Sequence, residues 1–149
     1  MNLRELRNIN LEETRKKIKE SFSKDLLVIQ SIHSIDELTK VINRLMESLR
    51  EWYGYYYPEL IKDVQSNDEV LDLILSNKKR NESIGSDFNK EDLDNINKFA
   101  RSIKNLYDTR NEEIKYLDKI IKEIAPNLGK IVEPLIIARL LEKAGSLKN

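Results

Sequence analysis

Apolar residues recur at steps of three and four along most of this chain, which is the spacing of one face of an α-helix. We expect residues 1–9 to be frayed, Asn10 and Glu13 to form an N-terminal capping box, and the helix to be weakest over residues 21–25. Neither proline nor glycine interrupts the first pattern, which comprises Leu11, Ile18, Phe22, Leu26, Ile29, Ile32, Ile35, Leu38, Ile42, Leu45, Leu49 and Trp52.

A stricter pattern follows in the second half of the chain. Asn89 is a candidate N-cap. After it, apolar positions alternate steps of three and four for about five heptads, which is typical of the seam of a coiled coil. Its members are Leu93, Ile96, Ala100, Ile103, Tyr107, Arg110, Ile114, Leu117, Ile121 and Ile124. Two long helices with a connector between them predict an antiparallel coiled-coil hairpin, so we expect an all-α fold.

The connector begins with an aromatic bend. Gly54 suits the end of one helix and a proline suits the first turn of the next. Aromatic rings pack well at such a bend, or they stack on the bases of single-stranded nucleic acid. No basic groove accompanies them, which favours packing. The residues of the bend are Trp52, Tyr53, Tyr56, Tyr57 and Pro58.

Short helical segments and a loop complete the tip of the hairpin. We expect one or two helical turns over residues 58–64, then a short helix behind a capping box of Ser66 and Glu69. Residues 77–89 are polar and form a loop.

The last stretch changes character after Pro126, which breaks the second pattern. It is more apolar, and it contains Pro134 and a glycine, Gly145, in a helix-stop position. Exposed apolar residues in this stretch need a partner surface, either the base of the hairpin or another molecule.

Composition agrees with a helical protein and narrows the chemistry. Charged residues make up 35% of the 149 residues, glycine and proline are scarce, and cysteine is absent. The absence of cysteine excludes disulfides and thiolate metal sites, and it favours a cytoplasmic location. No apolar run is long enough to cross a bilayer, and no signal peptide follows Met1. A formal net charge of zero excludes the strongly basic field of an autonomous nucleic-acid-binding protein.

No pattern predicts a catalytic, cofactor or metal site. His33 is the only histidine, and a metal ligand or catalytic base needs convergent partners. The adjacent pairs Asp36-Glu37 and Glu12-Glu13 point apart on a helix, so they are poor acid–base dyads.

Two charged features suggest interactions instead. Lys78, Lys79 and Arg80 form a compact basic cluster at the tip, which contacts RNA phosphate or only keeps the loop solvated. Arg110 occupies a seam position, where a buried charge needs an anion. Counting back from the bend makes Asp36 or Glu37 its expected partner.

Many residues match the Nop family in the family's order. The chain resembles the coiled-coil domain of Nop-family proteins from Lys24 onwards, and the start of the Nop domain itself from residue 125. The matching segments are 24–32, 35–38, Asn43, 49–53, 58–60, 83–85, 91–93, Tyr107, Arg110, 116–117, 125–128, 138–141 and 144–147.

This resemblance implies a non-catalytic scaffold of box C/D ribonucleoproteins, which guide ribose 2′-O-methylation. In the archaeal form, which the chain resembles most, an N-terminal domain holds a fibrillarin-type methyltransferase and the coiled coil pairs two copies. The Nop domain grips a kink-turn RNA together with its ribosomal-type protein. These partners, and a homodimer, are implied by the resemblance only.

The chain also departs from the family pattern. No methyltransferase-binding domain precedes residue 24, and the sequence stops before the RNA-contacting stretch of the Nop domain. The tip between Leu60 and Asn81 is shorter, as if one helix were missing, Tyr56-Tyr57 replace His-Phe, and a glycine-rich step is replaced at 134–137. We therefore expect a fragment or a truncated relative, with a linker over 1–24, a coiled-coil domain over 25–124 and an incomplete Nop domain over 125–149. The alternative is a free-standing dimerisation adaptor without a role in RNA binding, and the reading frame beyond Asn149 would distinguish the two.

Overall fold

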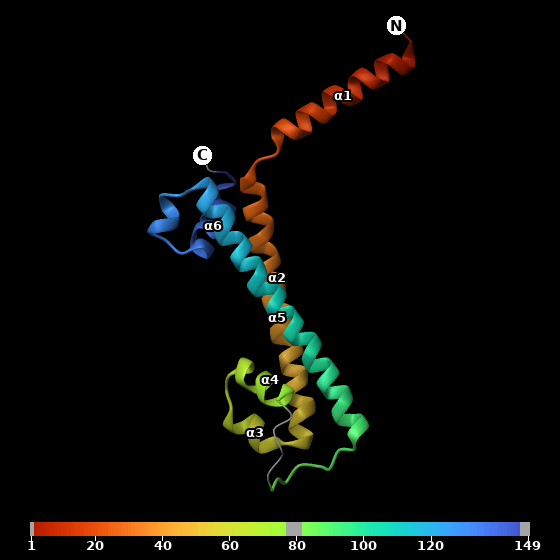
Figure 1. Ribbon diagram of the computed structural model, residues 1–149, viewed down its shortest axis with the longest axis vertical. Helices are drawn as coiled ribbons and strands as arrows, with labels where there is room; N and C mark the ends of the chain where they lie inside the picture. Colours follow the sequence, from red (N-terminus) through yellow and green to blue (C-terminus); the bar gives the residue numbers. More distant parts are fainter. Residues whose placement is uncertain (1, 77–81, 147–149) are drawn as a thin grey trace. The chain divides into compact units, whose positions relative to one another are not determined.

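The computed structural model describes residues 2–76 and 82–146, and these are helical with no strand among them (Figure 1). The predicted all-α class is confirmed. The elements are α1 (Leu3–Ser21), α2 (Lys24–Tyr56), α3 (Pro58–Asp63), α4 (Asn67–Leu75), α5 (Lys90–Ile124), a 3₁₀ turn η1 (Leu128–Lys130) and α6 (Pro134–Ala144).

The chain divides into two compact units. Unit 1 comprises Met1–His33 and Ile114–Asn149, and unit 2 comprises Ser34–Glu113. Helices α2 and α5 each contribute residues to both units. Pairing of the two helices over their full length as a coiled-coil hairpin stays a prediction.

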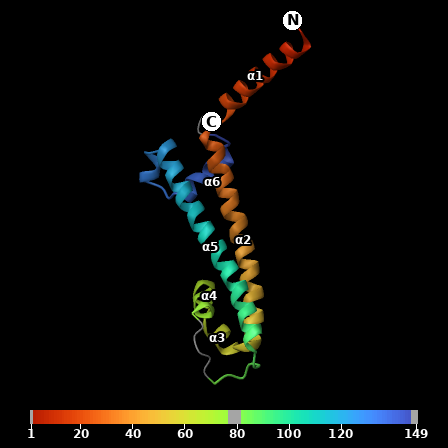
Figure 2. The same cartoon turned by 45° about the vertical axis from the view of Figure 1, so that its right-hand side comes forward.

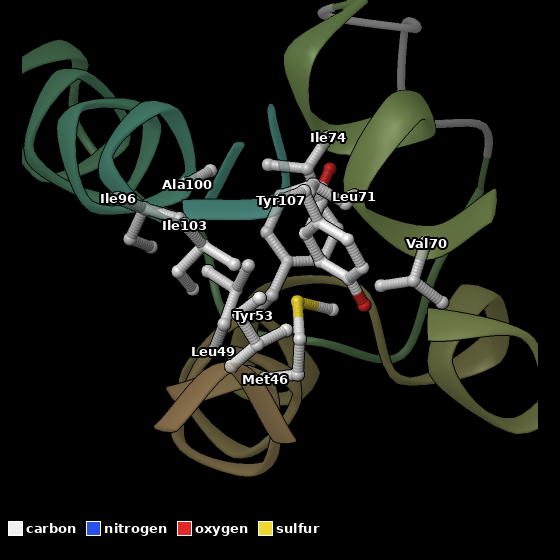
Figure 3. Close-up of a cluster of buried hydrophobic side chains, with 11 residues drawn as sticks. Met46, Leu49, Tyr53, Val70, Leu71, Ile74, Ile96, Ala100, Ile103 and Tyr107 are labelled. Carbon is white, nitrogen blue, oxygen red and sulfur yellow. The ribbon is translucent and has the colours of Figure 1, made fainter. Parts of the chain in front are cut away.

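In unit 2, parts of α2 and α5 run antiparallel, with α3 and α4 beside them (Figures 1 and 2). One buried cluster joins three of these helices, as Figure 3 shows. It consists of Ile42, Met46, Leu49 and Tyr53 from α2, Val70, Leu71 and Ile74 from α4, and Ile96, Ala100, Ile103 and Tyr107 from α5. Burial of these side chains supplies the main stabilisation of the unit.

The α5 seam matches the predicted pattern, whereas the α2 seam is displaced around the helix. Val28, Met46 and Tyr53, which the pattern omits, are buried on α2. Leu45 and Trp52, which the pattern includes, are only partly buried. Alpha-helical spacing fits both sets because α2 carries two adjacent apolar stripes, and the spacing alone does not say which stripe faces the core.

Helix ends in unit 2 follow local chemistry closely. Ser66 caps α4 by accepting from the amide of Glu69, and Asn89 and Asp92 form a reciprocal capping box at the start of α5. Pro58 is the first residue of α3, as predicted. The expectation that Gly54 ends the preceding helix is wrong, because α2 continues to Tyr56.

In unit 1, the start of α1 corrects the sequence prediction. Residues 3–9 are helical rather than frayed, and Asn10 lies inside α1 instead of capping it. The capping box is formed by Asn2 and Glu5, which are polar residues with the same spacing nearer the terminus. The predicted weak point is confirmed, since α1 ends at Ser21 and α2 begins at Lys24.

The C-terminal stretch folds back within unit 1. Helix α6 buries Ile137, Ala138 and Leu141 and is capped by Gly145, whose φ of 79° is in the left-handed region that glycine tolerates. Lys24 donates to Glu123, and this bond lowers the pKa of that carboxyl. This bond places the end of α5 beside the first turn of α2.

Candidate protein-interaction surface

The aromatic bend is a packed corner that closes unit 2 at the end of α2. Tyr53 is buried, and its ring meets that of Tyr56 edge-on at 5.5 Å between centroids. The Tyr56 ring in turn lies 5.4 Å from the Phe88 ring. Trp52, Tyr56 and Tyr57 all pack against the buried cluster. The rings therefore serve as apolar packing between α2, α3 and the segment before α5.

A short segment, which we call the strap (residues 83–86), is fastened across this corner. The Glu59 carboxylate accepts from the Ser83 hydroxyl at 2.6 Å and from the Ile84 amide at 2.9 Å. The Ser86 amide donates to the Tyr55 carbonyl at 2.8 Å, which satisfies one of the acceptors left at the end of α2. The strap thus caps α2 from a part of the chain distant in sequence.

Gly85 allows this close approach. A Cβ at this position would overlap the carbonyl oxygen of Tyr56 and would lie 2.7 Å from Cδ of Pro58. Only a residue without a side chain lets the strap reach the backbone of the bend.

Arg50 organises the other end of the tip. Its guanidinium donates to the carbonyls of Ile61 at 3.1 Å and Val64 at 2.7 Å, and also reaches the Gln65 carbonyl and the Asn67 side chain. These acceptors lie at the end of α3 and at the start of α4, so one partly buried charge holds both short helices on α2. Sequence reasoning missed Arg50, Glu59 and Gly85 because their partners are distant or are backbone atoms that leave no residue pattern.

Arg110 is placed where its charge meets an aromatic ring. The guanidinium carbon lies 5.0 Å from the centroid of the Tyr107 ring, a cation–π distance. Among the described residues, its Nε is buried without a hydrogen-bond partner. Burial, followed by the carboxylate of Asp68, raises the pKa of the Tyr107 hydroxyl.

The predicted partners of Arg110 lie in the same unit. Glu37 accepts from Lys40 at 2.7 Å, and this bond raises the pKa of that lysine. Pairing of Arg110 with Asp36 or Glu37 stays a prediction. The basic cluster of Lys78, Lys79 and Arg80 lies outside the described residues.

His33 lies in unit 1, where its Nε2 is 2.7 Å from Oε1 of Glu142. This contact connects α2 to α6. Within residues 2–76 and 82–146, no group of three or more histidine, aspartate or glutamate side chains is arranged to hold a metal ion. None of the helices described is long and apolar enough to cross a membrane.

Unit 2 has one apolar side that its own helices leave partly exposed. Arg50 faces α3 and α4, and Trp52 lies two residues further along α2, which turns it to the opposite side of the helix. On α5, Lys104 lies 4.0 Å from Asp72 of α4, and Leu106 is likewise two residues further on. We call this side, away from α3 and α4, the open side of unit 2.

The open side carries a second apolar stripe on α2, beside two hydrophobic residues of α5. Val41 is 45% exposed and Tyr55 is 63% exposed. The Trp52 ring contacts that of Phe99 at 6.2 Å between centroids. The stripe consists of Leu38, Val41, Leu45, Ser48, Trp52 and Tyr55, and the residues of α5 beside it are Phe99 and Leu106.

The described residues form an all-helical module that exposes apolar side chains on the open side of unit 2 and in unit 1. A family model described as "Nop: snoRNA binding domain, fibrillarin" matches residues 34–84 and 70–149. The chain belongs to the Nop family.

Several curated proteins are similar to the chain. It is 35% identical to an uncharacterized NOP5 family protein of Methanocaldococcus jannaschii, over 92% of this chain and 39% of that protein. It is 32% identical to nucleolar protein 56 of Saccharomyces cerevisiae, over 91% of this chain and 33% of that protein. Nucleolar protein 58 of Aspergillus terreus is 31% identical over 91% of this chain and 28% of that protein. The chain therefore spans well under half the length of these relatives.

The comparisons also bear on the short tip. The alignment with the M. jannaschii protein is 163 residues long, although it covers 92% of a chain of 149 residues. The relative therefore carries residues that this chain lacks. The two family-model matches overlap at residues 70–84, within and just after the tip that the sequence predicts to be short.

Proposed function

We propose that this chain is a non-catalytic scaffold component of box C/D ribonucleoproteins, which guide ribose 2′-O-methylation of RNA. The observation that carries the proposal is the Nop-family match over residues 34–149. The name of the family model refers to snoRNA binding and to fibrillarin, and two relatives are named as nucleolar proteins. The exposed apolar side chains of the open side support a role in binding other macromolecules.

In this proposal the chain contributes the segment between the catalytic and RNA-binding parts of the particle. Residues 1–24 act as a linker, residues 25–124 as the coiled-coil domain that pairs two copies, and residues 125–149 as the start of a Nop domain. The partners are a fibrillarin-type methyltransferase and a kink-turn RNA with its ribosomal-type protein. Direct contact of the chain alone with RNA is weak and electrostatic, because its formal net charge is zero.

The contrast between the internally bonded tip and the exposed apolar surfaces supports a scaffold role. The contacts of Arg50, Glu59 and Gly85 fix the tip of unit 2 internally. The open side remains available for a partner, as do Ile131, Ile136 and Leu140 of unit 1, which are 82%, 49% and 61% exposed. Exposed apolar side chains of this kind mark places where another surface packs.

An affinity-capture experiment tests the proposal. The immobilised chain is offered the methyltransferase, the kink-turn protein, and that protein bound to a box C/D guide RNA, first separately and then together. We expect the chain to retain the RNA–protein complex or the methyltransferase above the level retained by an unrelated helical protein of similar charge.

Retention of neither component would contradict the scaffold role. If the chain then bound only further copies of itself, the dimerisation adaptor would be the better account. The kink-turn RNA without its protein serves as a second control. Tight binding of this RNA that resists salt would contradict the weak electrostatic contact.

A further inference from the structure

Helix α1 carries most of its positive charges and all of its negative charges on different sides. Successive residues of an α-helix are turned by about 100° around its axis, so the direction of each side chain follows from its number. The glutamates of α1 therefore fall within about 100° of the circumference, which we call the acidic side. They are Glu5, Glu12, Glu13 and Glu20. Outside this arc lie Arg4, Arg7, Arg15, Lys17 and Lys19, which we call the basic face of α1.

The cations of the basic face form no ion pair with the described residues of the chain. The ion pair found in the described part of α1 joins Lys16 to Glu20 at 4.0 Å, and both of these residues lie on the acidic side. Every residue from 2 to 20 is exposed, so no described side chain covers the basic face. Unpaired cations that gather on one side of an exposed helix attract polyanions.

The arginines at the centre of this face suit phosphate groups. A guanidinium presents a planar fork of N–H donors that matches the oxygens of a phosphate. Arg4, Arg7 and Arg15 fall within about 80° of the circumference, and they extend over about 17 Å of the helix axis. One strand of a nucleic acid presents several phosphates over that length.

The apolar residues of α1 do not form a continuous stripe. Leu3, Leu11 and Ile18 are 83%, 44% and 63% exposed, and they lie on the same side as the arginines. Arg7 and Thr14 interrupt the line between them. A helix that lies on a membrane or in the groove of another protein uses an uninterrupted apolar face. The order of residues therefore favours a polyanion bound through its phosphates, and in the proposed function that polyanion is RNA.

We propose that the basic face of α1 is a binding site for the phosphate backbone of RNA, which Arg4, Arg7 and Arg15 contact and which Lys17 and Lys19 attract from the two edges. This inference rests on the proposed function, in which residues 1–24 act only as a linker, and it adds an RNA contact outside the Nop domain. The site recognises charge and not sequence, because phosphate contacts are the same for every base. Binding is therefore weak and strongly dependent on salt.

Salt-dependent binding of an RNA duplex tests the site. The full chain is titrated into a short fluorescein-labelled duplex without a kink-turn at several salt concentrations, and fluorescence anisotropy gives the dissociation constant. We expect Arg4→Gln, Arg7→Gln and Arg15→Gln each to reduce the slope of log affinity against log salt by about one, and the triple variant by about three. Circular dichroism should report unchanged helicity, because glutamine is a good helix former and the three positions are exposed.

Lys16→Gln is the matched control. It removes the same charge from the same helix, but Lys16 lies on the acidic side and pairs with Glu20. We expect its salt slope to equal that of the parent. Removal of residues 1–21 should weaken binding of the duplex at least as much as the triple arginine variant does.

Several results would overturn the inference. A parent chain that does not bind the duplex, or arginine variants with the salt slope of the parent, would exclude the site. A slope reduced equally by Lys16→Gln would show that only the total charge of the helix matters. Poly-L-glutamate that displaces the duplex as well as unlabelled duplex does, at equal charge, would indicate an acidic protein partner. Binding of anionic phospholipid vesicles in place of RNA would indicate a membrane.

Affinity capture of the ribonucleoprotein components, repeated with the triple arginine variant, separates this failure from that of the proposed function. Capture retained by the parent, together with duplex binding that is absent or unchanged in the variants, concerns the site on α1 alone. Loss of capture by the parent chain concerns the scaffold role.

Discussion

Gly85 lies where the backbone of unit 2 leaves no room for a side chain. Replacing it with alanine would force a Cβ into the carbonyl oxygen of Tyr56, which is backbone and cannot rotate away. We expect Gly85→Ala to lower the free energy of unfolding by about 1–3 kcal/mol, as overpacking does elsewhere. Urea denaturation monitored by circular dichroism measures the change.

The matched control is Gly54→Ala. A Cβ there meets only Cγ1 of Ile61 at 4.0 Å, and the position is inside α2. Alanine at this position should raise stability by about 0.5–1 kcal/mol, because glycine is a poor helix former. If Gly85→Ala unfolds at the same urea concentration as the parent, the strap does not approach the bend as closely as described.

Substitution of Arg110 tests how the charged residue in the predicted α5 seam contributes to stability. Its buried Nε lacks a hydrogen-bond partner, whereas its guanidinium gains a contact with the Tyr107 ring. We expect Arg110→Ala to cost about 1–3 kcal/mol, because a predicted carboxylate partner at Asp36 or Glu37 would lose its counter-charge. Arg110→Leu should cost less, because it restores an apolar seam.

A double-mutant cycle between Arg110 and each carboxylate isolates the pairing from the packing. Coupling close to zero for both Asp36 and Glu37 would show that the arginine serves the Tyr107 ring alone.

At the scale of elements, Arg50 should decide whether α3 and α4 stay on α2. Its four acceptors belong to the end of α3, the connector and the start of α4. Arg50→Ala removes all of these bonds, and we expect a loss of about 1–3 kcal/mol with faster amide exchange over residues 58–76. Arg44→Ala on the same helix is the control, since Arg44 is exposed. Equal exchange in the two variants would mean that the tip holds itself together without the clamp.

Helix α1 should contribute nothing to the stability of the rest of the chain. Every residue from 2 to 20 is exposed, so this part of the helix buries no side chain that would couple its unfolding to the core. Removal of residues 1–21 should therefore leave the thermal unfolding midpoint unchanged while lowering the helical signal. A lower midpoint would reveal packing of α1 against the remaining chain.

Capping motifs and apolar spacing predicted most elements. They failed where two neighbouring segments carry the same capping motif. Asn10 and Asn2 both precede a glutamate by three residues, and the helix begins at the earlier one. The loop–helix boundaries at Ser66 and Asn89 were predictable because each cap lies within one turn of sequence. The reciprocal capping box forms at Asn89, whereas Ser66 only accepts from the amide of Glu69. The hydrogen bond between Ser83 and Glu59 links residues 24 positions apart, and no periodic sequence pattern predicts such a contact.

For the whole molecule, composition and periodicity predicted the all-α class but did not predict the division into two units. Nor do they decide which stripe of α2 is buried, because Leu45 and Met46 belong to adjacent stripes with the same spacing. Burial of Met46 follows from α4, which packs on one side of α2 and leaves the open side partly exposed. Family resemblance, carried by specific motifs, supplied the functional hypothesis that composition alone did not contain.

The proposed role is that of a non-catalytic scaffold, two copies of which enter a box C/D ribonucleoprotein. Native mass spectrometry of a particle reconstituted from the chain, a box C/D guide RNA, the kink-turn protein and the methyltransferase tests this role. We expect a particle containing two copies of the 17.5 kDa chain. A particle that assembles without the chain, or with a single copy of it, would contradict the proposed role.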